Sequence, residues 1–534
     1  MPEKMVSPEL FRPSLEFPEV PYDHLLRQAA ERYPDRLAIV YRNISLTYRE
    51  VISMVNSIAN GLHDLGLRKG DRLCIYTTNR PEYPITFLAA ASLGIVISPM
   101  PPAYQESEIR YQLEHAEVKA ILVERGLAAN IVKAQEYCSS LRHILITGEQ
   151  ASEELPNAIP FAHLLRHSST RQEHFVEISP QDLLAIVYSS GTTGLPQGAM
   201  LTHRNLVSNN LQFIAAVGIH SDDVALIFLP FSHIYGTMLT GSFLACGGTQ
   251  VLMERFELQQ SLQLSAEYGV TYYFVVPSIV RALANAPIDL SRLNSVKYIF
   301  SGAAPLALEP ARELQKKTGI QVIQGYGLTE ASPVTHCQPR QKTVQRLASI
   351  GMPVHNCQQK IVDLATGERE LPVGEIGELL VSGPQVMQGY WKAPKATERV
   401  IHNGWLYTGD IGYIDSDGYT YIVDRKKDTF VCKGSEIAPA EIEALLLEHP
   451  AIIDAAIIGV PGDETSELIK GFVVVRKEMQ VTIEEILTFV NQKLKGPKCI
   501  YSLEFLDSIP KTASGKILRR ILREREKNSR RLRG

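Results

Sequence analysis

One short stretch, Tyr188-Ser-Ser-Gly-Thr-Thr-Gly-Leu-Pro-Gln-Gly-Ala-Met200, limits the folds open to this chain. It directly follows an apolar run, Leu183 to Val187, whose length and composition predict a buried strand. Glycines let a backbone approach an anion and point several N–H groups at it, and hydroxyls add donors without bulk. The stretch runs on into Thr202 to Leu206, a predicted helix start whose dipole would also favour an anion. A phosphate-binding loop between a strand and a helix is therefore predicted.

Several alternative assignments of this stretch have less support. A Ser/Gly-rich linker would not be expected between a buried strand and a helix. The stretch is not a Walker A motif, because no lysine stands in the required register. The sequence also lacks a G-x-S-x-G nucleophile elbow and an early G-x-G-x-x-G fingerprint, which argues against a hydrolase of that type and against a dinucleotide enzyme.

Length and composition indicate a globular protein of more than one domain. The chain has 534 residues, 45% of them hydrophobic, and a net charge of −4. Its seven cysteines are scattered, which suggests free thiols in a reducing compartment. The N-terminus lacks the apolar core of a signal peptide, and the longest apolar run, Phe87 to Met100, is divided by Gly94 and too short to span a membrane. We therefore expect a cytoplasmic protein with no integral membrane segment.

The order of predicted elements indicates an α/β fold. Strand-like segments at 71–76 and 120–124 alternate with helix-like segments at 48–65 and 106–115, a pattern typical of parallel sheets covered by helices. After about Ser349, short alternating strands and frequent Gly, Pro and Asp predict a small β-rich subdomain. A charged break, Asp424 to Asp428, precedes a compact α+β segment and is a candidate linker.

The C-terminus is basic, with nine Lys or Arg residues from Lys516 to Arg533. Ile517, Leu518, Ile521 and Leu522 form a helical apolar stripe within it. A solvated helix is favoured here over contact with nucleic acid or a membrane. No nucleic-acid partner is expected.

A second motif, Gln324-Gly-Tyr-Gly-Leu-Thr-Glu330, places two glycines around an aromatic residue. This arrangement suits a flat ring packed close to backbone. Thr329 and Glu330 offer a hydroxyl and a carboxylate to phosphate and metal, and Mg²⁺ takes few carboxylates in addition to water and phosphate oxygens. Taken alone, the motif could equally be a Gly-rich turn with a surface Glu.

Four further segments indicate a ligand-binding site only when they are considered together. Ser301 to Leu306 is crowded with small residues that leave room for a ligand, although it could be a tight turn. His233 lies between apolar residues, where a core histidine is the commoner case. The segment Trp405 to Asp410 ends in a carboxylate on a predicted turn. A Ser/Gly loop ends at Lys516, which could bring a flexible cation to a phosphate.

Taken in their order along the chain, from Ser189 to Lys516, these motifs resemble the signatures of the adenylate-forming superfamily. Its members are acyl- and aryl-CoA ligases, luciferases and the adenylation domains of peptide synthetases. The family loop reads Ser-Gly-Thr-Thr-Gly-x-Pro-Lys-Gly, and Gln197 stands here where the family usually has lysine. The resemblance implies a large N-terminal domain (1–424) of parallel sheets, helices and a β-rich subdomain. It also implies a hinge (425–427) and a small α+β C-terminal lid domain (428–534).

The resemblance also implies roles for individual residues. Lys516, Thr193, Glu330 and His233 would be catalytic, Glu330 would hold Mg²⁺, Lys427 would be the pivot, and Lys433 and Gly434 would serve the thioester step. Residues expected to bind the nucleotide are Ser189, Ser190, Gly191, Thr192, Thr193, Gly194, Gly302, Ala303, Ala304, Gln324, Gly325, Tyr326, Gly327, Thr329, Asp410, Arg425 and Lys516.

The implied reaction uses ATP, Mg²⁺ and coenzyme A. A carboxylic acid is activated to acyl-AMP and then transferred to CoA. The segments 233–238 and 302–304 are apolar and lack a charged partner, which favours a medium- or long-chain fatty acid, with an aryl acid as the alternative. An acyl-carrier protein as acceptor and a homodimer both stay open. Because Gln197 removes a charge, a degenerate nucleotide-binding paralogue without catalysis is the alternative of another class.

Overall fold

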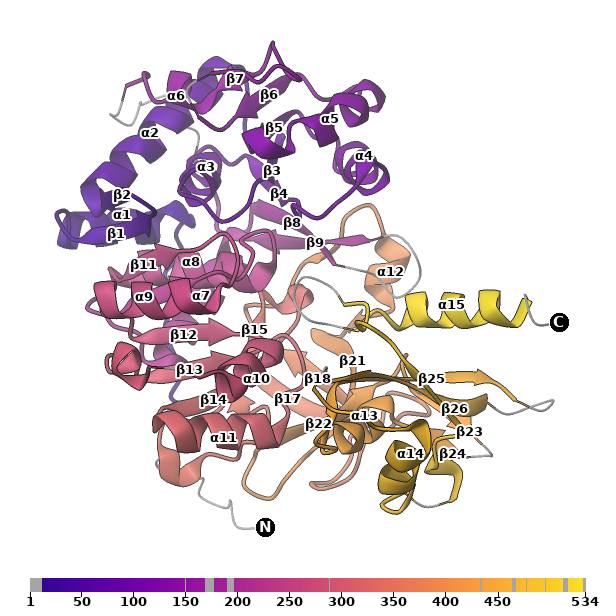
Figure 1. The fold of residues 1–534 in the computed structure, drawn as a ribbon. Coiled ribbons are helices and arrows are strands. Elements are labelled where there is room, and N and C mark those ends of the chain that lie inside the picture. Colours follow the sequence, from indigo (N-terminus) through magenta and orange to yellow (C-terminus); the bar gives the residue numbers. More distant parts are fainter. Residues whose placement is uncertain are drawn as a thin grey trace.

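The computed structural model describes residues 12–531 apart from 149, 169–176, 190–195, 288, 433–434, 463–466, 477, 495 and 512–516. Within these ranges, no helix is both long and apolar enough to cross a membrane. The described chain folds into a large α/β body with a small α+β domain on one side (Figure 1).

One sheet of the body has nine strands among the described residues. Its central strands, from β1 across to β14, pair in parallel, whereas β2, β15 and β16 pair antiparallel at the edges. In spatial order the strands are β2 (Ile44–Thr47), β1 (Leu37–Tyr41), β11 (Thr249–Leu252), β10 (Val224–Ile227), β12 (Tyr272–Val275), β13 (Tyr298–Ser301), β14 (Gln321–Gly327), β15 (Val334–Cys337) and β16 (Met352–Pro353).

The second sheet of the body has eight described strands. Its strands are β7 (Ile159–Pro160), β6 (His143–Ile146), β5 (Ala120–Val123), β3 (Arg72–Tyr76), β4 (Val96–Pro99), β8 (Leu183–Ser189), β9 (Gln197–Thr202) and β19 (Gly389–Tyr390). Pairing is parallel from β7 to β8, and then antiparallel from β8 through β9 to β19. Strand β19, far along the chain, therefore completes the sheet beside the predicted phosphate loop.

Helices pack against both sheets, and most of them follow the apolar periodicity of the sequence. Helices α2 and α7 begin at threonine capping boxes, Thr47 with Glu50 and Thr202 with Asn205. Helices α3 and α8 are buried on almost all sides, as expected inside a large core. The helices are α1 (Asp23–Arg32), α2 (Tyr48–Asp64), α3 (Glu82–Ala91), α4 (Glu106–His115), α5 (Ala129–Ala134), α6 (Phe161–Leu164), α7 (His203–Val217), α8 (Ile234–Cys246), α9 (Leu258–Tyr268), α10 (Pro277–Asn285) and α11 (Leu308–Thr318).

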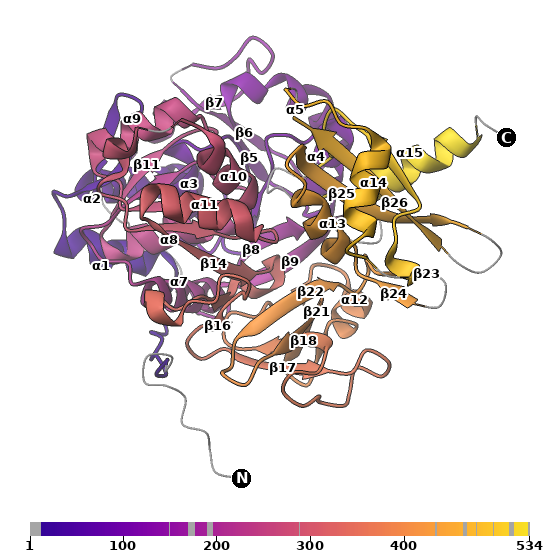
Figure 2. The ribbon, with the colours of Figure 1, turned by 60° about the horizontal axis from the view of Figure 1, so that its bottom comes forward.

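The predicted β-rich subdomain is confirmed. Its strands pair antiparallel in the order β17–β18–β21–β20, with β22 on β21. Figure 2 shows this subdomain at the bottom of the view, below the body and the terminal domain. Its elements are β17 (Gln358–Val362), β18 (Gly377–Ser382), α12 (Pro394–Glu398), β20 (Ile401–His402), β21 (Trp405–Ile414) and β22 (Thr420–Arg425).

The terminal domain has apolar clusters of its own, which lie on the two faces of its three-stranded sheet β25–β26–β27. The C-terminal helix α15 is present as predicted and extends away from the body (Figure 1). The elements are β23 (Phe430–Cys432), β24 (Ser435–Ile437), α13 (Pro439–Leu447), β25 (Ile452–Pro461), β26 (Glu467–Val475), α14 (Ile483–Asn491), β27 (Ser502–Phe505) and α15 (Arg519–Arg531).

One sequence prediction needs correction. The buried strand before the loop is confirmed as β8, but the chain does not pass from the loop directly into a helix. Strand β9 intervenes and pairs with β8, with Ser189 opposite Gln197. Residues Gln197 to Thr202 have enough buried apolar positions to join the sheet, and α7 starts only at His203. The loop is thus the end of a hairpin, and the dipole of α7 lies a strand's length away from it.

Candidate functional site

The stems of the predicted phosphate loop are held by side chains of α4. Ser190, Gly191, Thr192, Thr193 and Gly194 lie outside the described residues. On one stem, the hydroxyl of Tyr188 lies 2.8 Å from Nδ1 of His115. On the opposite stem, the hydroxyl of Tyr111 donates to the carbonyl of Pro196 over 2.9 Å. Tyr111 and His115 stack on each other, so one face of α4 contacts both ends of the loop.

Gln197 lies at the start of β9, half-buried and opposite Ser189. The next residue must be small, because a Cβ on Gly198 would come within 2.5 Å of Cγ2 of Ile186. The residue that departs from the family pattern is therefore anchored directly beside the loop by a close backbone approach.

The aromatic motif lies at the end of β14, against backbone. A Cβ on Gly325 would come within 2.4 Å of Phe300, and one on Gly327 within 2.2 Å of the carbonyl of Pro333. Both glycines therefore permit a close approach that any side chain would prevent. Between them, the ring of Tyr326 contacts His336 edge-to-face at 5.8 Å.

Tyr326, Asp410 and Arg425 form one polar cluster. The Tyr326 hydroxyl donates to Oδ2 of Asp410, and Nε of Arg425 lies 3.2 Å from Oδ1. Asp410 is 3% exposed, and β21 and β22 place it directly opposite Arg425. Burial, and then the neighbouring Asp410 charge, raise the pKa of Tyr326 well above its usual value, so the phenol stays a donor. The structure thus brings together three residues predicted separately from sequence.

The predicted small-residue segment follows β13. A Cβ on Gly302 would lie 3.3 Å from the ring of Tyr235, and Ala303 has a φ of +71°, a conformation uncommon for residues other than glycine. Such backbone conformations gather at functional sites. Gln324 is buried, and its amide donates to the carbonyl of Ser349 over 3.1 Å.

Glu330 has properties that fit a magnesium ligand. It lies just after Thr329, in a short 3-10 turn that follows β14, and is half-buried. Ser189 and Tyr390 donate to its Oε1 over 3.4 and 2.8 Å. No group of three metal-binding side chains occurs among the described residues, so they do not build a metal cage by themselves. A lone carboxylate beside a phosphate loop is what Mg²⁺ held mainly by phosphate oxygens requires.

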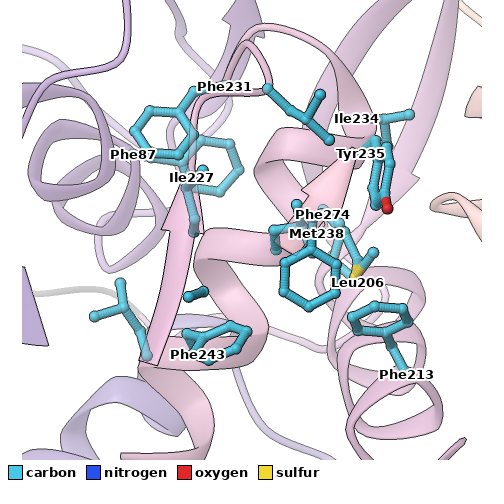
Figure 3. Packing of buried hydrophobic residues seen from close by; sticks show 14 of the residues in the cluster. Phe87, Leu206, Phe213, Ile227, Phe231, Ile234, Tyr235, Met238, Phe243 and Phe274 are labelled. Atoms are coloured by element: carbon cyan, nitrogen blue, oxygen red, sulfur yellow. The ribbon is translucent and has the colours of Figure 1, made fainter. Parts of the chain in front are cut away.

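His233 lies at the N-cap of α8. Its Nδ1 accepts from the backbone N–H of Tyr235 at 3.2 Å, so one role of the imidazole is to cap this helix. Beyond the cap, Ile234, Tyr235 and Met238 pack among phenylalanine rings, as Figure 3 shows. The structure therefore places the predicted acid-binding segment at the edge of a dense apolar core.

Helices α1, α3 and α8 enclose little free space where they meet. A cavity of about 10 Å³ lies there, which is about the room that one water molecule needs. Its walls include Tyr22, Pro84, Thr237, Thr240 and Gly241. A Cβ on Gly241 would meet the Tyr22 hydroxyl at 1.9 Å, so the packing is already close.

The charged break predicted as a linker lies where β22 ends. Asp424 accepts from the backbone N–H of Arg425 over 2.6 Å and from that of Ala440 in α13 over 2.9 Å. Lys426 pairs with the buried Glu378 at 2.8 Å, while Lys427 is exposed. Lys433, Gly434 and Lys516 lie outside the described residues.

Two residues that contact the candidate site, a tyrosine and a glutamate, were not predicted from the sequence. Tyr390 contacts Glu330, and Glu378 accepts from both Gly409 N–H and Lys426. The run Gly389-Tyr-Trp391 was a visible aromatic signal, but nothing in its spacing indicates contact with Glu330. Glu378 sits within an alternating strand pattern and carried no such signal.

Comparison with known proteins places these features in context. A family model described as "AMP-binding enzyme" matches residues 26–391, and one described as "AMP-binding enzyme C-terminal domain" matches residues 441–516. The chain is 38% identical to a 4-coumarate–CoA ligase-like protein of Oryza sativa subsp. japonica, over 93% of this chain and 91% of that one.

Two further similarities cover nearly the whole chain. A long-chain-fatty-acid–CoA ligase of Bacillus subtilis is 34% identical, over 96% of each chain. The crystal structure of ATP-bound MatB from Rhodopseudomonas palustris superposes with a TM-score of 0.86 at 28% identity, covering 95% of this chain and 99% of that one.

Proposed function

Because this chain belongs to the AMP-binding enzyme family, we propose that it activates an apolar carboxylic acid with ATP and transfers the acyl group to coenzyme A. It is an AMP-forming acid–thiol ligase of the adenylate-forming superfamily, and it uses ATP, Mg²⁺ and CoA. The observation that carries the proposal is the cluster of Tyr326, Asp410 and Arg425, which lies near Glu330, itself in contact with Ser189 of the hairpin.

In the proposed first half-reaction, the acid carboxylate attacks the α-phosphorus of ATP and pyrophosphate leaves. Tyr326 would cover the adenine, Asp410 would accept from the ribose hydroxyls, and Arg425 would hold Asp410 in place. Charge grows on the phosphoryl oxygens, so the protein's work is positioning and electrostatic stabilisation. Glu330 would hold Mg²⁺, which when bound neutralises phosphate charge.

We assign residues 1–424 to the N-terminal domain, 425–427 to a hinge and 428–534 to a mobile terminal domain. In this assignment Lys427 is the pivot, Lys516 acts in adenylate formation, and Lys433 and Gly434 act in thioester formation. The position of Asp424, bonded to both Arg425 and Ala440, supports a joint at this place. One lid that serves two reactions in turn requires such a joint.

The lid assignment predicts a split between the half-reactions. Lys516→Ala should lower the rate of acyl-adenylate formation by about 100-fold, because a cation at the developing charge is lost. Thioester formation from a supplied acyl-adenylate should change by less than about threefold. Single-turnover assays of each half-reaction measure both rates. An equal loss in the two assays would contradict the lid assignment.

For the acid, a medium- or long-chain fatty acid is the first candidate, supported by the uncharged, apolar residues of α8 and by the fatty-acid ligase relative. An aryl acid is the second candidate. The name of the rice relative agrees with this choice.

A panel of acids tests the proposal. Pyrophosphate release is measured with fatty acids of graded length and with cinnamic and benzoic acids, each with and without CoA. Thioester and AMP formed with CoA would support a ligase, and thioester formed only with an acyl-carrier protein would change the acceptor. No release with any acid would favour the non-catalytic paralogue.

A further inference from the structure

Tyr390 contacts a carboxylate that the proposed reaction needs. Its hydroxyl donates to Oε1 of Glu330 over 2.8 Å, and the Ser189 hydroxyl meets the same oxygen at 3.4 Å. Both donors that reach this side chain from the described part of the protein therefore end on one oxygen. The lone pairs of Oε2 are left to ligands from elsewhere.

The backbone holds both partners of this contact. The N–H of Met387 donates to the carbonyl of Glu330 over 2.9 Å. Tyr390 pairs with Ala199 of β9, and its own N–H donates to Oγ1 of Thr397 over 2.8 Å. The phenol thus reaches Glu330 from a strand fixed to the phosphate-loop hairpin, which gives the hydrogen bond a defined direction.

The charges around Glu330 differ from those around its acidic neighbours. Asp410 is paired with Arg425, and Glu378 with Lys426. Glu330, by contrast, forms no ion pair with any residue that the structure describes: its two donors there are neutral hydroxyls, and Arg425 and Lys427 attract it only without direct contact. A half-buried carboxylate whose neutral donors both end on one oxygen leaves the other oxygen open to a cation.

On the basis of the proposed function, we propose that Tyr390 is a positioning residue that orients Glu330 toward the Mg²⁺ of bound MgATP. The phenol takes up one carboxylate oxygen and fixes the plane of the group, so that the second oxygen meets the ion at a constant angle. Tyr390 itself touches neither the ion nor the reacting atoms. Its effect should therefore appear wherever the metal is involved and vanish where it is not.

The test is Tyr390→Phe, which removes only the hydroxyl. Isothermal titration calorimetry measures the dissociation constants of MgATP and, in EDTA, of AMP. We expect about tenfold weaker MgATP binding, since a hydrogen bond to a charged group is lost, with AMP binding unchanged. The Mg²⁺ concentration at half-maximal pyrophosphate release should rise by a similar factor. Equal weakening of MgATP and AMP, or no change in either, would overturn the proposal.

A matched control is Tyr407→Phe. It removes a phenol that donates over 2.8 Å to the carbonyl of Gly367, in the β-rich subdomain and away from Glu330. This variant should bind MgATP and AMP like the wild type. A loss of MgATP binding as large as that of Tyr390→Phe would mean that the effect is not specific to Glu330, and would contradict the proposal.

A double-mutant cycle separates positioning from folding. In a Glu330→Gln background, Tyr390→Phe should weaken MgATP binding by less than about twofold, because the group it orients no longer binds the ion. A full tenfold further loss would overturn the positioning role. If the wild type binds MgATP but forms no acyl-adenylate, the proposed function is wrong. The inference about Tyr390 is then still decided by the calorimetric comparison of MgATP and AMP binding.

Discussion

The nucleotide side of the candidate site and the core around α8 are built in opposite ways. On the nucleotide side, side chains from distant parts of the chain meet through polar contacts: Tyr326 and Arg425 both contact Asp410, and Tyr390 donates to Glu330. The α8 core joins apolar side chains by close packing, with phenylalanine ring centroids 5.4 to 5.9 Å apart. The first region depends on polar identity and the second on volume and shape, so substitutions in the two should have effects of different kinds.

The largest effect is expected from Asp410→Asn. This change keeps the shape but removes the charge that Arg425 faces, and breaking a buried charge pair costs about 2–5 kcal/mol. Pyrophosphate release should show kcat/KM for ATP falling by about 100-fold, and the urea midpoint should fall as well, because the same pair holds β21 against β22. Asp417→Asn, which breaks an exposed pair with Arg346, serves as the control and should stay near the wild-type rate. A change below about threefold at Asp410 would remove the contrast between the two regions.

Met238→Ala examines the second region. Met238 is 0% exposed, so a cavity should lower the free energy of unfolding by about 2–5 kcal/mol, as measured by urea denaturation. The new space should also shift the preferred acid toward longer or bulkier members, with KM for ATP unchanged. Met253→Ala, also buried but beyond β11, should destabilise without altering the preference. An unchanged preference in Met238→Ala would show that α8 does not border the acid.

Acidic pH should lower the stability of the folded protein through its buried histidines, one of which lies in the polar region. Burial lowers the pKa of His336, next to Tyr326, to about 4, and lowers the pKa of His203 and His355 to about 4 as well. Between about pH 6.5 and 4 the unfolded chain binds protons that the native state refuses, so stability falls as the pH falls, by about 1.4 kcal/mol per pH unit for each histidine. Urea midpoints at pH 7.5, 6.5 and 5.5 measure this loss. His336→Gln should flatten the profile, and a profile as steep as that of the wild type would exclude His336 as a contributor.

The smallest effect is expected from Gln197→Lys. A partly exposed cation beside the loop should lower KM for ATP by about threefold, because such charge contacts contribute less than about 1 kcal/mol. Steady-state kinetics at fixed Mg²⁺ measure the change. Gln181→Lys adds the same charge at an exposed position outside the hairpin and should leave KM unaltered. A rise in KM for Gln197→Lys would indicate that this position does not bear on the phosphates.

Local patterns predicted much of this fold. The helix at 106–115 and the strand before the loop were predicted, because a few adjacent residues are enough to define which positions of each element are buried. Strand β9 was missed because Gln197-Gly-Ala-Met-Leu-Thr202 lacks the β-branched, alternating pattern of an isolated strand. It becomes a strand through pairing with β8 on one side and β19 on the opposite side, which no local pattern reveals.

The candidate site shows the same division. Glycines with a fixed role, such as Gly325 and Gly327, were visible as a motif. The contact between Tyr390 and Glu330, and the turning of the Gln324 amide toward Ser349, depend on long-range packing. Asp410 and Arg425 were known as separate residues only through family resemblance, and the β21–β22 pairing explains physically why they meet.

The pairing of β8 with β9 limits how the predicted phosphate loop between them can be exchanged. In a transplant of residues 190–195 from a relative, both stems must keep their length, because a one-residue slip of β9 would reverse the face of every side chain in it. Gln197 would then occupy the place of Gly198, where the side chain of Ile186 leaves no room for a Cβ. Donor segments of equal length should therefore be accepted, whereas those one residue longer should misfold the sheet edge.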